Sequence, residues 1–184
     1  MKSISKDFDL KRFVSHNIRE LTLFAILIVI AVLVQVRTGG RFLSSSNLND
    51  LLRETAILMM VSVGMMMVIL TGCIDLSLGS TMGLAGMICA LTLRDHRETP
   101  IIVIVLIALG IGLLAGLLNG FIVAKLRIFP LIGTLGVCDM LRGLVYVFSK
   151  GAWVGQGDMT QEFMSISTGK VFGINNLVFI AMTI

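Results

Sequence analysis

The chain has 184 residues, of which 56% are hydrophobic and 14% are charged, and its mean hydropathy is +0.97. Soluble domains carry about 25% charged residues, so this composition excludes a soluble globular domain, and its apolar content excludes a disordered chain. The net charge of +4 does not indicate nucleic acid, because the basic residues flank apolar runs, where anionic lipid headgroups explain them. The composition therefore predicts a membrane protein with no nucleic-acid partner.

Apolar runs of membrane-spanning length follow one another along the chain. A helix needs roughly 17–25 apolar residues to cross a bilayer. Five runs meet or approach that length, and a sixth begins near residue 171 and is still apolar at residue 184; the five lie at about 20–36, 55–70, 76–93, 100–124 and 131–148. We expect an all-α polytopic membrane helix bundle that forms one transmembrane domain with five complete spans. We also expect the chain to be a C-terminally truncated fragment.

The segments between the apolar runs indicate where a helix starts and how the chain is oriented in the membrane. Ser44 to Asn47 resembles a helix start and predicts a short interfacial helix ahead of the second span. Basic residues divide evenly between the two sides of the membrane, so only the N-terminal cluster sets the orientation. That cluster favours a cytoplasmic N-terminus.

Polar residues gather at the junction of the second and third runs. Thr71, Asp75 and Ser77 stand there with two glycines between uncharged apolar segments. A carboxylate at membrane depth is costly unless it is solvated, paired or neutralised, and non-helical backbone there needs protein or a water-filled cavity around it. We therefore expect an interruption near Thr71–Asp75. Asp75 either caps the next helix, accepting from the amide of Ser77 or Leu78, or lines a water-accessible path; capping is favoured.

Small residues recur every four positions in the fourth run. Ala108, Gly112, Gly116 and Gly120 would form a ridge on one helix face, which predicts close packing against another helix. Asn119 lies beside this ridge. It is expected to join helices by hydrogen bonding, with a place on a polar path as the alternative.

The fifth run contains two charges of opposite sign. Asp139 and Arg142 are three residues apart, which predicts an ion pair on one helix face within the membrane, with a role in solute passage as the alternative. The run is preceded by Lys125–Pro130, where proline disfavours helix at the residue before it. This segment predicts a turn at the membrane surface.

Sequence patterns for catalysis are missing. The stretch Ser167–Lys170 lacks the first glycine and the final Ser/Thr of a nucleotide-binding P-loop. The three cysteines lack C-x-x-C spacing and are interpreted as small buried residues; they are Cys73, Cys89 and Cys138. We expect no catalytic, cofactor-binding or metal-binding residue in this chain.

Three stretches in order carry a family resemblance. Ile69–Ser80 is similar to the signature TGGIDLSVGS, Gly116–Pro130 to GLxNGxLVxxLxIPP, and Thr134–Gly143 to TLGxxxxxRG. These are signatures of the permease subunits of bacterial ABC sugar importers, the group for ribose, xylose, arabinose and galactose. The resemblance extends over roughly residues 42–151.

Several positions depart from the family pattern. Cys73 stands where a second glycine is usual, Phe129 where a second proline is common, and Gly133 where alanine is common. The family continues through further spans, and its loop that couples permease to ATPase would lie beyond residue 184. The coupling surface is therefore expected to be largely missing from this chain.

The resemblance implies the N-terminal part of a permease domain in the bacterial inner membrane. A second permease copy or homologue, an ATP-binding subunit and an extracytoplasmic solute-binding protein would be its partners, besides membrane lipid and a small sugar. ATP and Mg would bind the ATPase, so this chain would be a transport subunit rather than an enzyme. Candidate turn or path residues are then Thr71, Asp75, Ser77, Asn119 and Thr134, and on the path Asp75 would contact sugar hydroxyls.

Two other classes of protein share part of this pattern. A secondary transporter of a small polar solute would also use broken spans and intramembrane acids without an ATPase. It would usually contain an internal repeat, and no second copy of the sequence of residues 71–80 occurs in this chain. A membrane anchor would explain the spans but not the polar junction.

Overall fold

The computed structural model describes residues 17–171 and 174–183. The chain forms two compact units, residues 1–52 and 53–184, and the division between them lies within helix α3 (Ser45–Leu70). Each unit is described by itself. Most of the basic N-terminal cluster lies before residue 17 and so outside the described residues.

The first unit consists of helix α2 (Ile18–Arg37), a short turn and the start of α3. No residue of α2 is buried, as expected of a helix whose apolar side chains face lipid. Side chains order the turn: Gln35 accepts a hydrogen bond from the amide of Leu43 at 2.9 Å, and Asn47 donates to the carbonyl of Phe42 at 2.7 Å.

Helix α3 is one continuous helix of 26 residues. The short interfacial helix expected before the second span is therefore wrong as a separate element. Residues 45–70 contain no proline and one glycine, Gly64, so nothing in this stretch ends the helix before residue 71.

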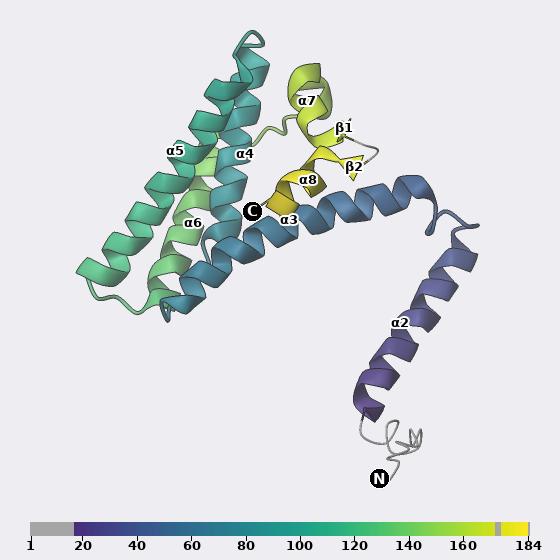
Figure 1. Ribbon diagram of the computed structural model, residues 1–184. Coiled ribbons are helices and arrows are strands. Elements are labelled where there is room, and N and C mark those ends of the chain that lie inside the picture. The colour runs from purple at the N-terminus through teal and green to yellow at the C-terminus, as the bar shows by residue number, and fades with distance from the viewer. Residues whose placement is uncertain (1–16, 172–173, 184) are drawn as a thin grey trace, which may run out of the picture. The chain divides into compact units, whose positions relative to one another are not determined.

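Three helices of the second unit lie side by side: α4 (Leu78–Asp95), α5 (Ile101–Gly120) and α6 (Pro130–Ser149) (Figure 1). Helix α4 packs against both of the others. Apolar residues buried between them form two clusters; one contains Leu84, Ala115, Val137 and Leu141, and the other contains Cys89, Leu93 and Ile104. The buried positions of α4 recur at helical spacing, so one face of this helix is covered by its neighbours.

Helix α5 continues into a π-helix, η1 (Phe121–Lys125). The expected span at 100–124 coincides with α5 and most of η1, but the sequence did not predict the change in helix type. Arg127 then adopts a left-handed conformation, with φ of 56°, in the turn that leads to α6. Helix α6 begins at Pro130, which occupies the first helical position, where a missing amide proton costs nothing.

Four described helices are long and apolar enough to cross a membrane. They are α2, α3, α5 with η1, and α6, with mean hydropathies of 2.2, 1.7, 3.1 and 1.6. Helix α4 lies at the expected third span but is not among the four, so the described residues do not provide the expected five. It has 18 residues, contains three glycines and ends in Arg94 and Asp95, which lowers its hydropathy.

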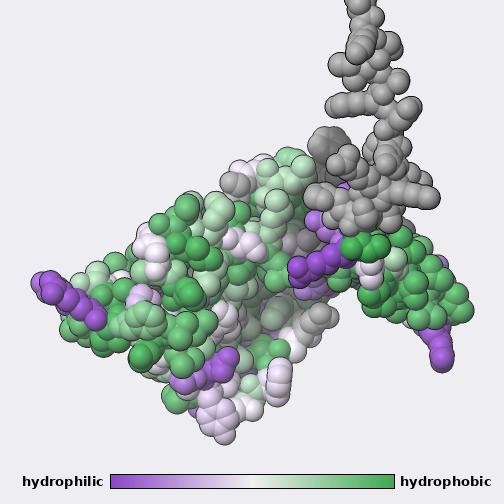
Figure 2. Space-filling view, turned by 90° about the horizontal axis from the view of Figure 1, so that it is seen from below, coloured by the Kyte–Doolittle hydropathy of each residue, from purple (hydrophilic) through white to green (hydrophobic). Residues whose placement is uncertain are grey.

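The outward-facing helix surfaces are apolar. Leu106, Leu109 and Leu113 of α5 are all exposed, and Figure 2 shows hydrophobic residues over most of the visible surface, with hydrophilic residues in small clusters. In water such a surface would drive association, whereas in a bilayer it is the surface that lipid contacts. The expected all-α membrane helix bundle is confirmed, and the chain is a multi-pass membrane protein.

The described chain after α6 contains short elements: η2 (Gln156–Asp158), α7 (Gln161–Thr168), β1 (Lys170–Val171), β2 (Ile174–Asn175) and α8 (Asn176–Thr183). The strands pair antiparallel, with Lys170 opposite Asn175. The sixth apolar run therefore starts in a strand pair, which was not predicted, and becomes helical only at Asn176. Gly169 ends α7 in an extended conformation, and the Asn175 side chain accepts from the amide of Leu177 at 2.9 Å, which starts α8.

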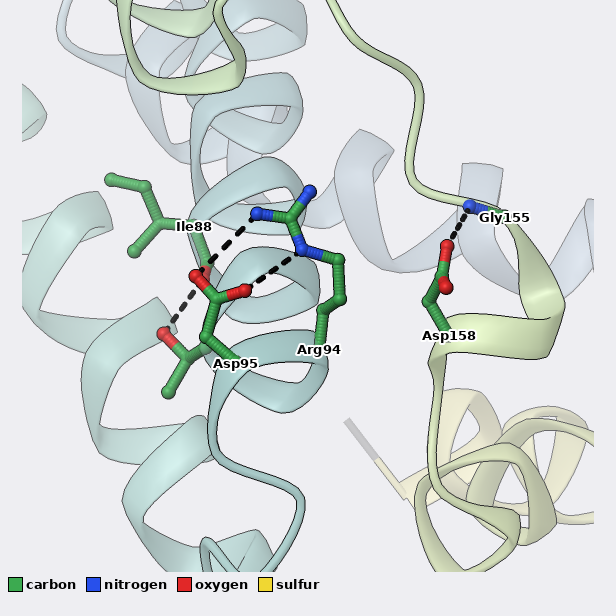
Figure 3. A network of polar contacts seen from close by, with 6 residues as sticks. Ile88, Arg94, Asp95, Gly155 and Asp158 are labelled. Carbon is green, nitrogen blue, oxygen red and sulfur yellow. Dashed lines mark hydrogen bonds and ion pairs between the residues drawn. The ribbon is translucent and has the colours of Figure 1, made fainter.

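Polar contacts occur near the end of α4 (Figure 3). Arg94 and Asp95 form an ion pair with 2.8 Å between Nε and Oδ1, and Asp158 accepts from the amide of Gly155 at 3.0 Å. Exposed ion pairs between neighbouring residues contribute little to stability. This end of the bundle is therefore polar surface.

Candidate functional site

The break between α3 and α4 is a tight turn that contains the polar junction. Helix α3 ends at Leu70, and Gly72 follows with φ of +78°, a conformation that glycine adopts without strain. Thr71 donates its hydroxyl proton to the carbonyl of Val68 at 2.6 Å. Cys73 does not have a positive φ, so the cysteine at the second glycine position of the signature imposes no strain.

Asp75 is bonded to the start of α4. Its Oδ1 accepts from the backbone amide of Ser77 and from the Ser77 hydroxyl, both at 2.7 Å. Ser77 occupies the N-cap position of α4 and is fully buried, with 0% exposed. Asp75 thus makes the amide contact on which the capping interpretation depends, from two residues before the cap.

Asn119 connects α5 to the same turn. Its Nδ2 donates to Oδ2 of Asp75 at 3.1 Å and to the hydroxyl of Ser77 at 2.7 Å. The amide nitrogen must face Asp75, because a carboxylate only accepts hydrogen bonds. Asn119 is 8% exposed, and its Oδ1 is buried without a hydrogen-bond partner among the described residues.

Thr134 connects α6 to the turn. Its hydroxyl accepts from the amide of Leu76 at 3.1 Å and lies 2.9 Å from the carbonyl of Pro130 and 3.3 Å from that of Ile74, either of which can accept its proton. Its exposed fraction is 3%. The turn is therefore held by one side chain from each of two helices.

These contacts surround a cavity of about 390 Å³. Four of the five candidate turn or path residues line it; the fifth, Ser77, is not a lining residue but bonds to two of them. The lining residues are Val68, Thr71, Cys73, Ile74, Asp75, Gly116, Asn119, Gly120, Val123, Ala124, Pro130 and Thr134. One carboxylate is the only charged group among these described lining residues. The π-helix η1 supplies part of the wall.

The sequence predicts other roles for some of the cavity residues. Cys73 is partly exposed and lines the cavity, whereas Cys89 and Cys138 are buried, so the interpretation of all three as buried is wrong for Cys73. Gly116 and Gly120 stood out in the sequence as packing residues only. No local sequence signal identified the part of the cavity wall that η1 supplies, because the position of η1 depends on how α5 ends.

The expected helix-packing ridge is only partly used within the described chain. Ala108 packs against the Cys89–Leu93–Ile104 cluster. A Cβ on Gly112, Gly116 or Gly120 would meet no atom within 4 Å. The covered face of α5 is centred on Ala115 and Asn119 instead. Gly116 and Gly120 each follow one of these residues in the chain and therefore lie on a neighbouring face of the helix. Close packing at the glycines stays a prediction.

The expected pair of Asp139 and Arg142 does not form an ion pair in the described part of the chain. Both residues are exposed on α6. A three-residue spacing allows contact but does not enforce it, since each side chain has several rotamers that point away. Arg142 instead lines a separate hollow with Tyr146 and Trp153.

Comparison with known proteins assigns the chain to a family. The family described as branched-chain amino acid transport system, permease component, matches residues 47–184. The ribose import permease protein of Haemophilus influenzae is 36% identical over 176 residues, which cover 95% of this chain and 52% of the relative. The autoinducer 2 import system permease protein of Enterobacter sp. is 35% identical over 160 residues, 86% of this chain and 45% of the relative.

A third relative also matches most of this chain. The xylose transport system permease protein of Escherichia coli K12 is 33% identical over 169 residues, 89% of this chain and 43% of the relative. The chain thus spans about half the length of the curated relatives that it matches. No solved structure matches. With its polar turn, its bundle of apolar helices and this match over most of its length, the chain belongs to the permease family of the branched-chain amino acid transport system type.

Proposed function

We propose that the chain acts in the permease subunit of an ATP-binding-cassette importer and forms part of the path for a monosaccharide or related small polar solute. The observation that carries this proposal is the cavity at the α3–α4 break, where Asp75, Asn119 and Thr134 stand in an otherwise largely apolar lining inside an apolar helix bundle. Intramembrane ionisable residues commonly mark solute pathways. The relatives named for ribose, xylose and autoinducer 2 support a small polar solute.

The proposal includes partners that supply energy and substrate. ATP and Mg would bind a partner ATPase, in agreement with the lack of a P-loop in this sequence. A second permease subunit would complete the path, and an extracytoplasmic solute-binding protein would deliver the solute. The N-terminus would lie in the cytoplasm of a bacterium, with the bundle in its inner membrane.

Purification from the native membrane tests this assignment. We expect the affinity-tagged intact permease, expressed from its native gene, to co-purify with an ATPase that contains P-loops. Proteoliposomes containing that complex and its binding protein should accumulate labelled D-ribose or D-xylose when Mg-ATP is added on the ATPase side. Uptake by the permease without the ATPase, driven by an ion gradient, would overturn the proposal.

A further inference from the structure

A second hollow, of about 410 Å³, is lined by α4, by the last turns of α6 and by the residues that follow α6. It shares no lining residue with the cavity at the α3–α4 break. We propose that this hollow binds an anionic phospholipid, with the lipid phosphate at Arg142 and an acyl chain along the apolar wall. The proposal goes beyond the proposed function, because it assigns a partner to a different surface and does not depend on which solute is carried.

The hollow follows one face of α6 towards the end of that helix. Arg142, Val145, Tyr146 and Ser149 line it, and their spacing of three, one and three residues places them on a single helix face. Met87 adds a side chain from α4. The hollow therefore extends along the helix from the level of Arg142 to the turn after Ser149.

Arg142 is an exposed cation inside a membrane-spanning helix. It precedes Ser149, the last residue of α6, by seven positions, or about 10 Å along the helix axis. It forms no ion pair or hydrogen bond with the described part of the chain, and Asp139 is not among the residues that line the hollow. A charge at this depth is costly without a partner. An arginine side chain can extend along an apolar wall and bring its guanidinium to the membrane surface.

Two aromatic side chains mark the end of the hollow that meets the membrane surface. Tyr146 is 71% exposed and Trp153 is 95% exposed. Both residue types are enriched where a membrane meets water, because an apolar ring carries one polar group. Gly151, with φ of +72°, turns the chain back so closely that a Cβ on it would lie 3.4 Å from the Tyr146 ring. The turn thus holds this end of the hollow at the level of the lipid headgroups.

The chemistry of the lining fits an anion that carries an apolar tail. Arg142 is the only charged group among the described lining residues, and a guanidinium can bind phosphate through two parallel hydrogen bonds. The hydroxyl of Tyr146 and the indole N–H of Trp153 are further donors, and neither is bonded within the described chain. Met87 and Val145 supply apolar wall, which suits an acyl chain and gives nothing to a free anion.

Trp153 provides a reporter of what occupies the hollow, because it is the only tryptophan in this sequence. The intact permease, with any tryptophan elsewhere in it replaced by phenylalanine, is reconstituted into phosphatidylcholine bilayers. Part of that lipid is then exchanged for phosphatidylglycerol or phosphatidylcholine with the same dibrominated acyl chains, which quench tryptophan fluorescence on contact. Because the chains are identical, the difference in quenching reports the preference for the headgroup.

We expect dibrominated phosphatidylglycerol to occupy the hollow about fivefold more strongly than dibrominated phosphatidylcholine, the factor that one basic residue contributes at an anionic lipid surface. Arg142→Gln should abolish this preference, whereas Arg142→Lys keeps the charge and should retain part of it. Arg97→Gln is the control, because it removes an exposed cation at the same end of the bundle but outside the hollow. A preference that survives Arg142→Gln would overturn the proposal. Lack of preference in the unsubstituted permease would overturn it whether or not the variants fold.

A second reporter on the same helix separates the hollow from the general headgroup layer. In the double variant Trp153→Phe with Phe148→Trp, the tryptophan stands at an exposed position one residue before the end of α6 that does not line the hollow. Position 148 lies two residues after Tyr146 and therefore on nearly the opposite side of the helix. Both brominated lipids should quench this reporter equally. The same preference at both reporters would overturn the proposal, because the whole surface would then attract anionic lipid.

Other occupants of the hollow give distinct results. A protein segment over it, from a second subunit or from elsewhere in the permease, would shield Trp153 from both brominated lipids while the reporter at position 148 is still quenched. That result would overturn the proposal. Inorganic phosphate that replaces sodium chloride at constant ionic strength should leave the lipid preference unchanged. Loss of the preference in phosphate would mean that the hollow binds a free anion, and would overturn the proposal equally.

Discussion

Single residues at the α3–α4 turn have two roles at once. Asp75 bonds to the start of α4 and also lines the cavity, so the two alternatives drawn from the sequence, a cap and a path residue, do not exclude each other. Asn119 likewise joins α5 to the turn and keeps one acceptor unused. The structural bonds hold the polar groups in place where a solute could meet them.

Thr134 gives a test of how the turn is held. Thr134→Val keeps the shape of the side chain but removes the acceptor for the amide of Leu76. Leaving that amide unpaired should destabilise the permease by about 1–3 kcal/mol, measured by thermal unfolding in detergent. Thr92→Val is the control, because Thr92 bonds only to the carbonyl of Ile88 one turn earlier in its own helix. Equal losses in the two variants would show that the Leu76 contact is unimportant.

Asp75 can be tested for its structural contact in the same way. Asp75→Asn retains an oxygen that can accept from the amide of Ser77, whereas Asp75→Leu removes it and leaves donors of Ser77 and Asn119 unpaired. We expect Asp75→Leu to cost about 1–3 kcal/mol more than Asp75→Asn in detergent unfolding experiments. Equal stability of the two variants would contradict a structural role for the carboxylate oxygens.

The candidate residues could be found from the sequence, but their partners could not. Asp75, Asn119 and Thr134 stood out because each is polar inside or beside an apolar run, which is costly without a reason. Their hydrogen bonds join positions 44 residues apart for Asn119 and Asp75, and 58 apart for Thr134 and the backbone amide of Leu76. Such bonds depend on how α4, α5 and α6 pack. For Asp139 and Arg142, by contrast, a local spacing rule predicted an ion pair that the described chain does not form.

At the scale of helices, breaks with strong local signals were predicted and others were not. Gly72 and Pro130 mark the end of α3 and the start of α6 through backbone rules that need no tertiary information. The π-helix η1 lacks such a signal and depends on how the end of α5 meets α6. The β1–β2 pair likewise lies in a run that reads as apolar and would suit a helix equally well.

A glycine where α6 approaches η1 tests that packing. In Gly133→Ala the new methyl group would lie 2.8 Å from Cγ2 of Ile122, a β-branched side chain with restricted rotamers. We expect a loss of roughly 1–3 kcal/mol from overpacking, measured by thermal unfolding in detergent. On the same helix, Gly136→Ala meets no atom within 4 Å and should be neutral or stabilising, because alanine favours helix. A stable Gly133→Ala would show that Ile122 can move freely.

At the scale of the whole bundle, alternation of helix direction assembles the site. Asp75 precedes α4, Asn119 lies near the end of α5, and Thr134 lies in the first turns of α6, so all three meet at one end of the three helices (Figure 1). Short connections between α4, α5 and α6 require neighbouring helices to run in opposite directions. The common end could therefore be inferred from the order of spans, whereas the cavity itself required the packed structure.

This alternation predicts which connections share a side of the membrane. In a permease with Cys73, Cys89 and Cys138 replaced by alanine, single cysteines are introduced at three exposed positions, by Glu98→Cys, Arg127→Cys and Ala152→Cys. An impermeant maleimide should label positions 98 and 152 from one side and position 127 from the other, as comparison of intact spheroplasts with inverted vesicles would reveal. With the N-terminus in the cytoplasm, as proposed, and with α4 crossing the membrane as well as α2, α3 and α5, position 127 is labelled from the cytoplasmic side. The reverse orientation would overturn this combination and leave the bundle intact, whereas labelling of 98 and 127 from the same side would mean that α5 with η1 does not cross the membrane.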